Sequence, residues 1–297
     1  MRFDKRPHSI CFVGDTGKDN GGQQRVADAL AADVECTLTV FVGDIIYPNG
    51  AKNGEVKKPC DSDSQWCKKF YDYYGSFCDG DPNRHCAYIE GNHDASSKDS
   101  VSEWSMADAL YPNIHYPRQW YSIVMGDVCL FGLDSNVISN AEQITWFQKE
   151  KQKLNDRCAF SIVFTHHNYR VAGFKDTDPP VEEFHERYLN GVVDLVVSGH
   201  DHHNSVSDQI KGTYFTVAGA GAENRGTKIP VPSYNLFAWG KKCSSKCMSE
   251  DYLGYAKLTF DGQTGSNARL RFIVDQPSSR GNFTQQYERV LHGSGIR

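Results

Sequence analysis

Short hydrophobic runs recur along the chain, and each ends in a polar or glycine-containing cluster. Apolar runs this short are typical of strands that are buried on both faces. The pattern predicts strands at Ile10–Val13, Leu38–Val42, Ala87–Glu90, Val128–Leu133, Phe160–Thr165, Val192–Ser198 and Tyr214–Ala218. These strands are expected to form the interior of a layered fold.

Amphipathic helical patterns lie between several of these strands, at Gln23–Ala32, Glu103–Leu110, Ala141–Leu154 and Val181–Leu189. Alternating strands and helices predict an α/β fold with the helices on the outside. The helical patterns stop after Thr213. We expect Tyr255–Phe260 and Leu270–Val274 to be antiparallel strands that close a sheet.

One long polar segment interrupts this alternation between Asn49 and Arg84, and only the aromatic stretch Trp66–Phe77 within it fits a helix. Loops this long in compact domains are usually functional, disordered or cross-linked. The segment is rich in cysteine, which favours a cross-linked loop. We therefore predict one domain over residues 1–297 with a cysteine-rich insertion at about 49–86.

The chain contains ten cysteines, which is many for a cytosolic protein. Local disulfides are expected in the insertion, with Cys60–Cys67 and Cys78–Cys86 as the favoured pairs. A zinc site formed by these four residues is the alternative, although the segment contains no CxxC pair. Cys11 and Cys129 lie inside apolar runs and are expected to be buried free thiols.

The cysteine content points to a secreted, periplasmic or organelle-lumen protein, with a cytosolic location as the alternative. The first apolar stretch, Ile10–Val13, is too short for a signal peptide, so none is expected. A glycosylation sequon at Asn282-Phe283-Thr284 is weak evidence by itself.

Composition and charge exclude some functions. Hydrophobic residues make up 39% and charged residues 23% of the chain, as in an ordinary globular protein. The formal net charge of −5 offers no basic surface for nucleic acid. No apolar run approaches the roughly 18 residues of a membrane-spanning helix. The sequence does not indicate an oligomeric state.

Chemically active side chains follow five of the predicted strands. Loops at the carboxyl ends of strands in an open α/β sheet meet in one crevice, so these side chains are expected to lie together. The segments are Gly14-Asp15-Thr16-Gly17, Gly43-Asp44-Ile45-Ile46-Tyr47, Gly91-Asn92-His93-Asp94, Thr165-His166 and Gly199-His200-Asp201-His202.

These residue types suit a pair of metal ions. Aspartate and asparagine supply oxygen ligands, and neutral histidine supplies nitrogen for iron or zinc. One carboxylate can bridge two neighbouring ions. Each segment alone also fits an ordinary turn, such as an Asx turn at Asn92-His93-Asp94. Their joint occurrence after buried strands favours a dinuclear metal site.

The series GDTG, GDIIY, GNHD, VFTH and GHDH resembles the five sequence blocks of the calcineurin-like metallophosphoesterases. Tyr47 lies three residues after Asp44, and a tyrosine at this spacing resembles the one that distinguishes the purple acid phosphatase branch of the family. The blocks span Gly14 to His202. The resemblance implies a four-layer α/β/β/α sandwich of two mixed sheets flanked by helices, in the small single-domain form of the family.

The resemblance also implies two metal ions. Ferric iron would be held by Asp15, Asp44, Tyr47 and His202. The second metal ion (divalent iron, zinc or manganese) would be held by Asp44, Asn92, His166 and His200. Asp44 would bridge the two ions. The alternative for Tyr47 is that it merely packs beside Pro48 in a turn.

By the same resemblance, the substrate is a phosphomonoester cleaved at acid pH by a metal-bound hydroxide, and His93 gives a proton to the leaving group. Many relatives carry a further histidine near the position of Lys175. The candidates to replace it in substrate binding are His167, Tyr169, Arg170 and His203. The alternatives are a phosphodiesterase or pyrophosphatase on the same site, or an inactive phosphatase-like scaffold protein.

Overall fold

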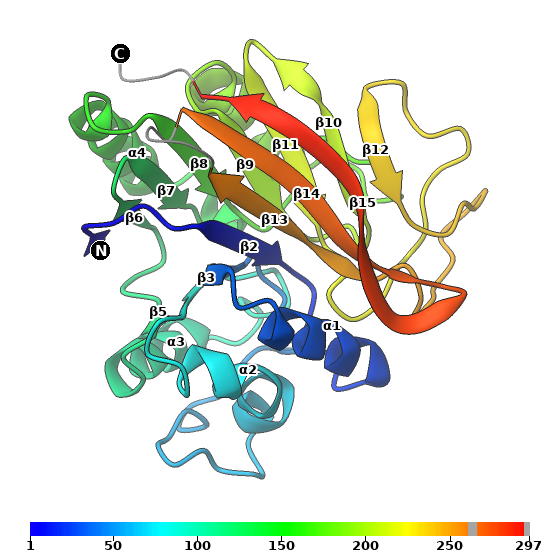
Figure 1. Cartoon of the computed structure of the whole chain (residues 1–297). Helices are drawn as coiled ribbons and strands as arrows, with labels where there is room; N and C mark the ends of the chain where they lie inside the picture. Colours follow the sequence, from blue (N-terminus) through cyan, green and yellow to red (C-terminus); the bar gives the residue numbers. More distant parts are fainter. Residues whose placement is uncertain (261–265, 294–297) are drawn as a thin grey trace.

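The computed structural model describes residues 1–260 and 266–293. Over these ranges the chain forms two mixed β-sheets packed face to face, with helices on their outer sides (Figure 1). The first sheet has seven described strands and the second has eight. This arrangement confirms the predicted α/β fold class, with two mixed sheets flanked by helices.

Each sheet combines a run of parallel strands with antiparallel strands. The first sheet has the order β15 (Ser279–His292), β14 (Asn267–Gln276), β13 (Gly254–Phe260), β2 (Ser9–Val13), β3 (Cys36–Phe41), β4 (His85–Tyr88) and β5 (Ile114–His115). The second has the order β1 (Arg2–Phe3), β6 (Tyr121–Met125), β7 (Val128–Gly132), β8 (Phe160–Phe164), β9 (Leu195–Ser198), β11 (Thr213–Ala218), β10 (Asn204–Ile210) and β12 (Asn235–Trp239).

The helices form the outer layers. The first sheet is flanked by α1 (Gly21–Ala32), α2 (Asp72–Cys78) and α3 (Ser100–Leu110), and the second by α4 (Ala141–Leu154) and α5 (Pro179–Phe184). All four helical patterns predicted between strands are helical. Short π-helical segments, Cys67–Tyr71 and His185–Leu189, precede α2 and follow α5. The predicted Trp66–Phe77 helix is therefore also present, in two parts.

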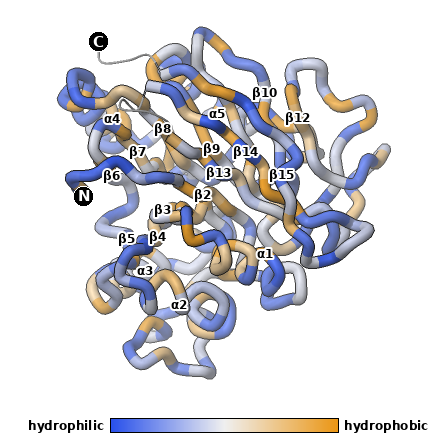
Figure 2. Tube along the Cα trace, viewed as in Figure 1, coloured by the Kyte–Doolittle hydropathy of each residue, from blue (hydrophilic) through white to orange (hydrophobic). Residues whose placement is uncertain are grey.

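The central strands are buried on both faces, as their apolar runs predicted. In β8, Ile162 and Phe164 face the core between the sheets, whereas Val163 faces the core beneath α4 and α5. Figure 2 shows hydrophobic segments concentrated in these inner strands and hydrophilic ones in the outer loops. The rigid double sheet fixes the positions of the loops that leave its strands.

Several strands were not predicted, namely β1, β5, β6, β10, β12 and β15. β12 and β15 lie at sheet edges and are only partly buried, so they lack a continuous apolar run. The predicted strand Val192–Ser198 begins only at Leu195. Hydrophobic runs therefore identified most of the inner strands, whereas the partly exposed edge strands and the inner strands β6 and β10 escaped this signal.

All ten cysteines lie in the described residues and form five disulfides: Cys11–Cys36, Cys60–Cys67, Cys78–Cys86, Cys129–Cys158 and Cys243–Cys247. Both pairs predicted in the insertion are confirmed. The prediction of free thiols at Cys11 and Cys129 was wrong. Their partners lie 25 and 29 residues away in sequence, Cys36 at the start of β3 and Cys158 just before β8, so local sequence gave no sign of them.

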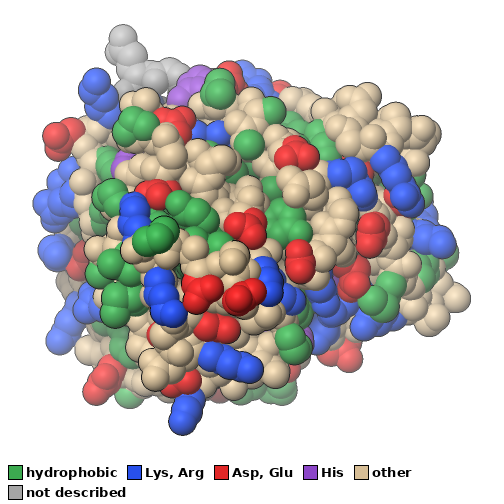
Figure 3. Space-filling model, turned by 90° about the horizontal axis from the view of Figure 1, so that it is seen from below, with side chains coloured by type: hydrophobic (Ala, Val, Ile, Leu, Met, Phe, Trp, Pro, Cys, Tyr) green, Lys and Arg blue, Asp and Glu red, His purple; other side chains and the backbone are tan. Residues whose placement is uncertain are grey.

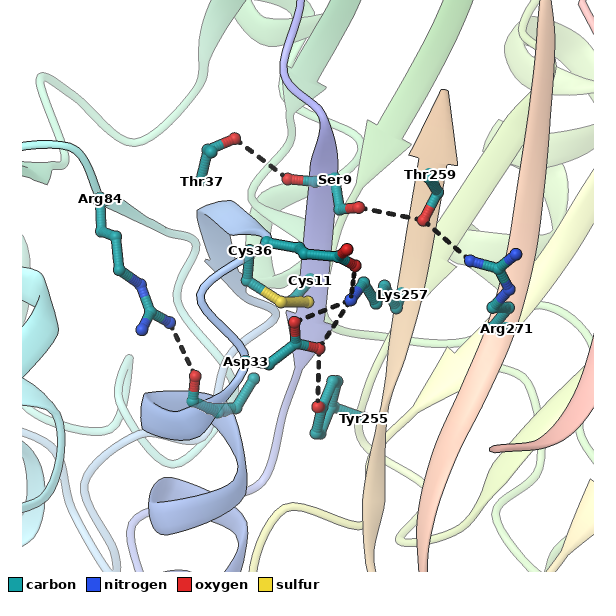
Figure 4. The surroundings of a disulfide bond; sticks show 12 residues. Ser9, Cys11, Asp33, Cys36, Thr37, Arg84, Tyr255, Lys257, Thr259 and Arg271 are labelled. Carbon is teal, nitrogen blue, oxygen red and sulfur yellow. Dashed lines mark hydrogen bonds and ion pairs between the residues drawn. A yellow bond between two sulfur atoms is a disulfide. The ribbon is translucent and has the colours of Figure 1, made fainter. Parts of the chain in front are cut away.

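The surroundings of Cys11–Cys36 show a structural role (Figure 4). The Lys257 ammonium group lies 2.7 Å from Asp33 and 2.7 Å from Glu35, and the Tyr255 hydroxyl donates to Asp33. The two sulfurs are bonded to each other and Asp33 is neutralised by Lys257. This group of Cys11, Asp33 and Cys36 is therefore a cross-link with an ion pair rather than a metal site.

The outer surface is polar and mixed in charge. The face seen from below, on the side of α2 and α3, carries basic and acidic side chains side by side (Figure 3). Within the described residues, no helix combines the length and apolar character needed to cross a membrane.

Candidate metal centre

The loops that follow β2, β3, β4, β8 and β9 meet at one point. The first three strands belong to one sheet and the last two belong to the other. Their carboxyl ends place Asp15, Asp44, Asn92, His166 and His200 together, and His202 follows on the last loop. The sequence predicted that these loops converge. The structure adds that the proposed ligands come from both sheets rather than from one.

The first group of ligand atoms surrounds the Tyr47 hydroxyl. This oxygen lies 2.9 Å from Asp44 Oδ2, 3.1 Å from Asp15 Oδ1 and 3.1 Å from His202 Nε2. His202 Nε2 also lies 3.1 Å from Asp15 Oδ1. All four side chains are buried.

The second group surrounds His166 Nε2. This nitrogen lies 3.2 Å from His200 Nδ1, 3.3 Å from Asn92 Oδ1 and 3.4 Å from Asp44 Oδ1. Asp44 thus contributes Oδ2 to the first group and Oδ1 to the second. Asn92 and His200 are partly exposed, so the centre opens to solvent on this side.

These separations fit metal coordination. Nitrogen and oxygen ligands bound about 2.1 Å from one ion lie roughly 3.0–3.4 Å apart at octahedral or tetrahedral angles. The separations in both groups lie in or within a tenth of an ångström of this range. Asp15, Asp44 and His166 also place one ligand atom each within 4.8 Å of one another. The residues present therefore fit two ions that share Asp44.

The backbone at this centre is held in uncommon conformations. Asp15, Asp44 and His200 have positive φ angles of 59°, 55° and 67°. Non-glycine residues rarely occupy this region, and they persist there only where surrounding contacts fix them. His200 is held by its backbone N–H, which donates to Asp15 Oδ2 over 2.8 Å. Three of the six non-glycine residues with positive φ in the described part of the chain are therefore proposed ligands.

Glycine is needed where two loops touch. A Cβ at Gly91 would lie 2.1 Å from Asp44 Oδ1, and one at Gly43 would lie 2.5 Å from His166 Nδ1. Any side chain at either position would displace a proposed ligand. The glycines of the second and third motifs thus permit close approach.

The orientations of His166 and His202 are set by the ring nitrogen that faces away from the centre. His166 Nδ1 donates to the Val42 carbonyl over 2.8 Å, which leaves Nε2 with a lone pair toward the centre. His202 Nδ1 lies 3.3 Å from Glu223 Oε1. Such outer contacts fix the tautomer of a ligating histidine.

The sequence analysis missed Glu223. Burial alone would raise the pKa of its carboxyl group, but the contact with His202 and the charge of Lys18 lower it to about 2. Glu223 follows β11, the strand predicted at Tyr214–Ala218, so the same strand-end signal would have found it.

Asp94 was quoted within a motif but given no role. It is fully buried and accepts hydrogen bonds from the backbone N–H groups of Ile45, Ile46 and Gly91. These bonds join the loop of Asp44 to the loop of Asn92. Asp94 therefore holds two ligand-bearing loops in register.

His93 lies at the edge of the centre. Its ring packs against the Tyr47 ring with 4.4 Å between centroids, and Nδ1 donates to the Pro48 carbonyl over 2.7 Å. Its backbone N–H donates to Asp44 Oδ1. Because a carbonyl only accepts, Nδ1 keeps its hydrogen and Nε2 is the atom that can gain or release a proton.

The four substrate-binding candidates lie in different surroundings. The His167 ring lies 4.5 Å from the His200 ring, between centroids, and lines a cleft of about 610 Å³ with Ser135 and Asp178. Tyr169 stacks on His185. Arg170 lies over the Tyr234 ring. His203 is fully buried, with Nε2 accepting from the Ala172 N–H. Of these four side chains, His167 is the one that packs against a proposed metal ligand, His200.

Two facing mixed sheets that gather aspartate, asparagine and histidine at their strand ends define a metallophosphoesterase. Residues 8–204 match the profile of the calcineurin-like phosphoesterases. The chain belongs to this family, and the resemblance inferred from the five motifs is confirmed.

The sequence identity between this chain and a named relative is low. Purple acid phosphatase 1 of Ipomoea batatas is 22% identical over 233 residues, which are 72% of this chain and 46% of that protein. The chain thus spans about half the length of this curated relative.

Two solved structures share the fold. GAP50, the anchor in the inner membrane complex of Plasmodium, superposes with a TM-score of 0.72 at 17% identity, over 97% of this chain and 90% of that chain. Purple acid phosphatase PPD1 of yellow lupin (Lupinus luteus) gives 0.67 at 16% identity, over 95% of this chain and 53% of that chain.

Proposed function

We propose that this protein is an acid phosphatase that cleaves phosphomonoesters with two metal ions, one ferric and one divalent. The observation that carries the proposal is the pair of ligand groups that meet at Asp44, with separations suited to two ions. In this assignment, the ferric ion is held by Asp15, Asp44, Tyr47 and His202. The divalent ion (iron, zinc or manganese) is held by Asp44, Asn92, His166 and His200.

When bound, the metal pair supplies Lewis acidity that activates water and offsets negative charge on the phosphoryl oxygens. Side chains and backbone groups of the protein orient the ligands and supply the proton. Glu223 and the Val42 carbonyl hold the two imidazoles in orientation. His93 carries a proton on Nε2 to the leaving oxygen, while its Nδ1–H stays on Pro48.

The cleft beside His167 is the proposed place for the leaving group. It lies between residues 135–140 and residues 178–181, next to the partly exposed side of the centre. The Ser135 hydroxyl and His167 Nδ1 are 2.8 Å apart, so the wall offers polar contacts from fixed groups. Tyr169, Arg170 and His203 have contacts within the fold and act, in this proposal, by positioning the loop after β8.

The proposal is tested by measuring metal content and ester hydrolysis on the same purified sample. We expect about two metal ions per chain and hydrolysis of aryl and alkyl phosphomonoesters with an optimum at acid pH. Faster cleavage of a diester such as bis(p-nitrophenyl) phosphate would instead support the phosphodiesterase alternative. A metal-loaded protein that cleaves none of these esters would contradict the proposal.

A second candidate function is that of an anchoring scaffold. It is favoured by one observation, namely the likeness to GAP50, which is described as an anchor in Plasmodium. A scaffold has no need of strained ligand positions, and all seven proposed ligands are present here. The test above separates the two functions, because a scaffold would not hydrolyse esters.

The disulfides support an oxidising compartment for this protein. We propose that it acts in a secreted, periplasmic or organelle-lumen location, as one metallophosphoesterase domain with a cysteine-rich insertion at 49–86.

A colour change is expected in Tyr47→Phe. Burial and the neighbouring Asp15 and Asp44 carboxylates raise the pKa of the Tyr47 hydroxyl well above its usual value. Only a strongly Lewis-acidic ion would therefore hold it as phenolate, and a ferric phenolate absorbs visible light. We expect a violet or pink iron-loaded protein whose visible band disappears in Tyr47→Phe, with iron content retained. The control Tyr188→Phe, on the segment after α5, should keep the band. An oxidised, iron-loaded wild type without it would contradict tyrosinate ligation.

A further inference from the structure

The segment around β12 differs in charge from the rest of the chain. No aspartate or glutamate lies between Asn224 and Ser249. Five residues of this segment are basic, namely Arg225, Lys228, Lys241, Lys242 and Lys246. The formal net charge of the whole chain is −5, so acidic residues elsewhere conceal this basic segment. β12 is an edge strand of the second sheet, at the opposite edge from β1, which follows the N-terminus (Figure 1).

Two large hydrophobic side chains are exposed in the same segment. Ile229 is 60% exposed and Met248 is 62% exposed. Three of the lysines are exposed as well: Lys241, Lys242 and Lys246. A single exposed hydrophobic residue is normal on a protein surface, but these two accompany charges of one sign. Apolar side chains among lysines are typical of proteins that bind the surface of a lipid bilayer.

Backbone hydrogen bonds join the parts of the segment before and after β12. The Thr227 N–H donates to the Lys241 carbonyl over 2.8 Å, and the Thr227 carbonyl accepts from the Cys243 N–H over 3.0 Å. The Cys247 N–H donates to the Arg225 carbonyl over 3.1 Å. The disulfide Cys243–Cys247 closes the turn between these contacts. The two parts therefore form one surface that is fixed by the fold.

We refer to residues 225–229 and 241–248 as the basic loop. We infer that the basic loop docks the protein on a membrane whose surface carries anionic phospholipids. The lysines lie at the negatively charged headgroups, and Ile229 and Met248 enter the boundary between headgroups and acyl chains. Each lysine at such a surface raises the affinity about fivefold. This contact is peripheral, and it is independent of the proposed phosphatase function.

The exposed side chains favour a lipid surface over nucleic acid. Proteins that bind single-stranded nucleic acid combine cations with aromatic rings on which the bases stack. The three aromatic residues of this segment instead pack on side chains of the fold: Tyr234 on Arg170, Phe237 on Tyr287 and Trp239 on Tyr252. The exposed hydrophobic side chains of the basic loop are aliphatic, which suits insertion among lipids.

The charge requirement is tested by cosedimentation of the purified protein with vesicles. We expect binding to vesicles of phosphatidylcholine mixed with phosphatidylserine, little binding to phosphatidylcholine alone, and weaker binding at high salt. Lys241→Gln/Lys242→Gln should lower the affinity for the mixed vesicles roughly 25-fold. The control Lys149→Gln/Lys153→Gln removes the same charge from exposed positions on α4 and should bind like the wild type.

The apolar requirement separates a membrane from other anionic partners. Ile229→Ser/Met248→Ser should lower the vesicle affinity about tenfold or more, because two buried side chains are lost from the contact. Met106→Ser, at a position on α3 that is 47% exposed, is the control and should have no effect. Circular dichroism should show that every variant is folded.

A last arm separates the basic loop from the metal centre. Inorganic phosphate, added at matched ionic strength, should leave vesicle binding unchanged. Loss of binding in phosphate would assign it to the metal centre and overturn the inference. Tighter binding to single-stranded DNA than to the mixed vesicles, or vesicle binding that survives both double substitutions in the basic loop, would also overturn it. A protein that binds the vesicles as expected but cleaves no ester would contradict the proposed function and leave this inference intact.

Discussion

Asp44→Asn is expected to remove both metal ions and to lower turnover by about 10³-fold or more, because metal ions contribute several kcal/mol to such reactions. Asp44 is the residue whose two oxygens join the two ligand groups. Burial raises the pKa of this carboxyl group, but the close contact with His166 and the hydrogen bond from the His93 N–H outweigh burial and hold the pKa below its usual range. The carboxylate is therefore charged in the folded protein. An amide of the same shape has no charge to share between two cations.

The fold should survive this substitution. The His93 N–H donates to Asp44 Oδ1, and an asparagine oxygen accepts the same bond. Metal analysis and hydrolysis should be measured beside circular dichroism on the variant and on Asp156→Asn, an exposed aspartate after α4. A folded Asp44→Asn protein with two metals and full activity would remove the dinuclear assignment.

His93→Ala is expected to keep its metals and to lose roughly 10²–10⁴-fold in turnover on alkyl phosphates. The Nδ1–H bond to Pro48 leaves Nε2 as the atom that releases a proton to the leaving oxygen. An alkoxide needs this proton, whereas p-nitrophenolate leaves without it. The loss on p-nitrophenyl phosphate should therefore be much smaller.

The ratio of the two losses distinguishes proton donation from a purely structural role of the His93 ring, which also packs on Tyr47. Glycerol phosphate and p-nitrophenyl phosphate should be compared at equal metal content, with His8→Ala on the exposed surface as the control. Equal losses on both esters would argue against His93 as the proton donor.

The inner half of the fold was predictable because its signal is local. Strands such as β2, β3 and β8 are buried on both faces, so each appears as a continuous apolar run in its own sequence. The edge strands β12 and β15 are mostly exposed or half-buried, and each pairs with one neighbouring strand. Their residues alone did not indicate them.

The candidate ligands were predictable for a similar reason. Asp15, Asp44 and His166 each follow directly after a buried strand, and the carboxyl ends of such strands converge whatever the rest of the chain does. The types of these residues and their order along the chain were enough to propose the set of metal ligands. Their assignment to two metals stays a prediction until the variants above are measured.

Tertiary structure alone decided which distant residues touch. Cys11 meets Cys36 because β2 pairs with β3, and Glu223 meets His202 because β11 lies beside β9. Arg225 reaches the same place through its bond to the His202 carbonyl. The amino-acid sequence by itself therefore determined most of the inner strands, the residues at their carboxyl ends and the family. The pairing of strands determined the disulfides and the contact of the Glu223 carboxylate with His202, because these depend on sheet register and loop packing across many residues.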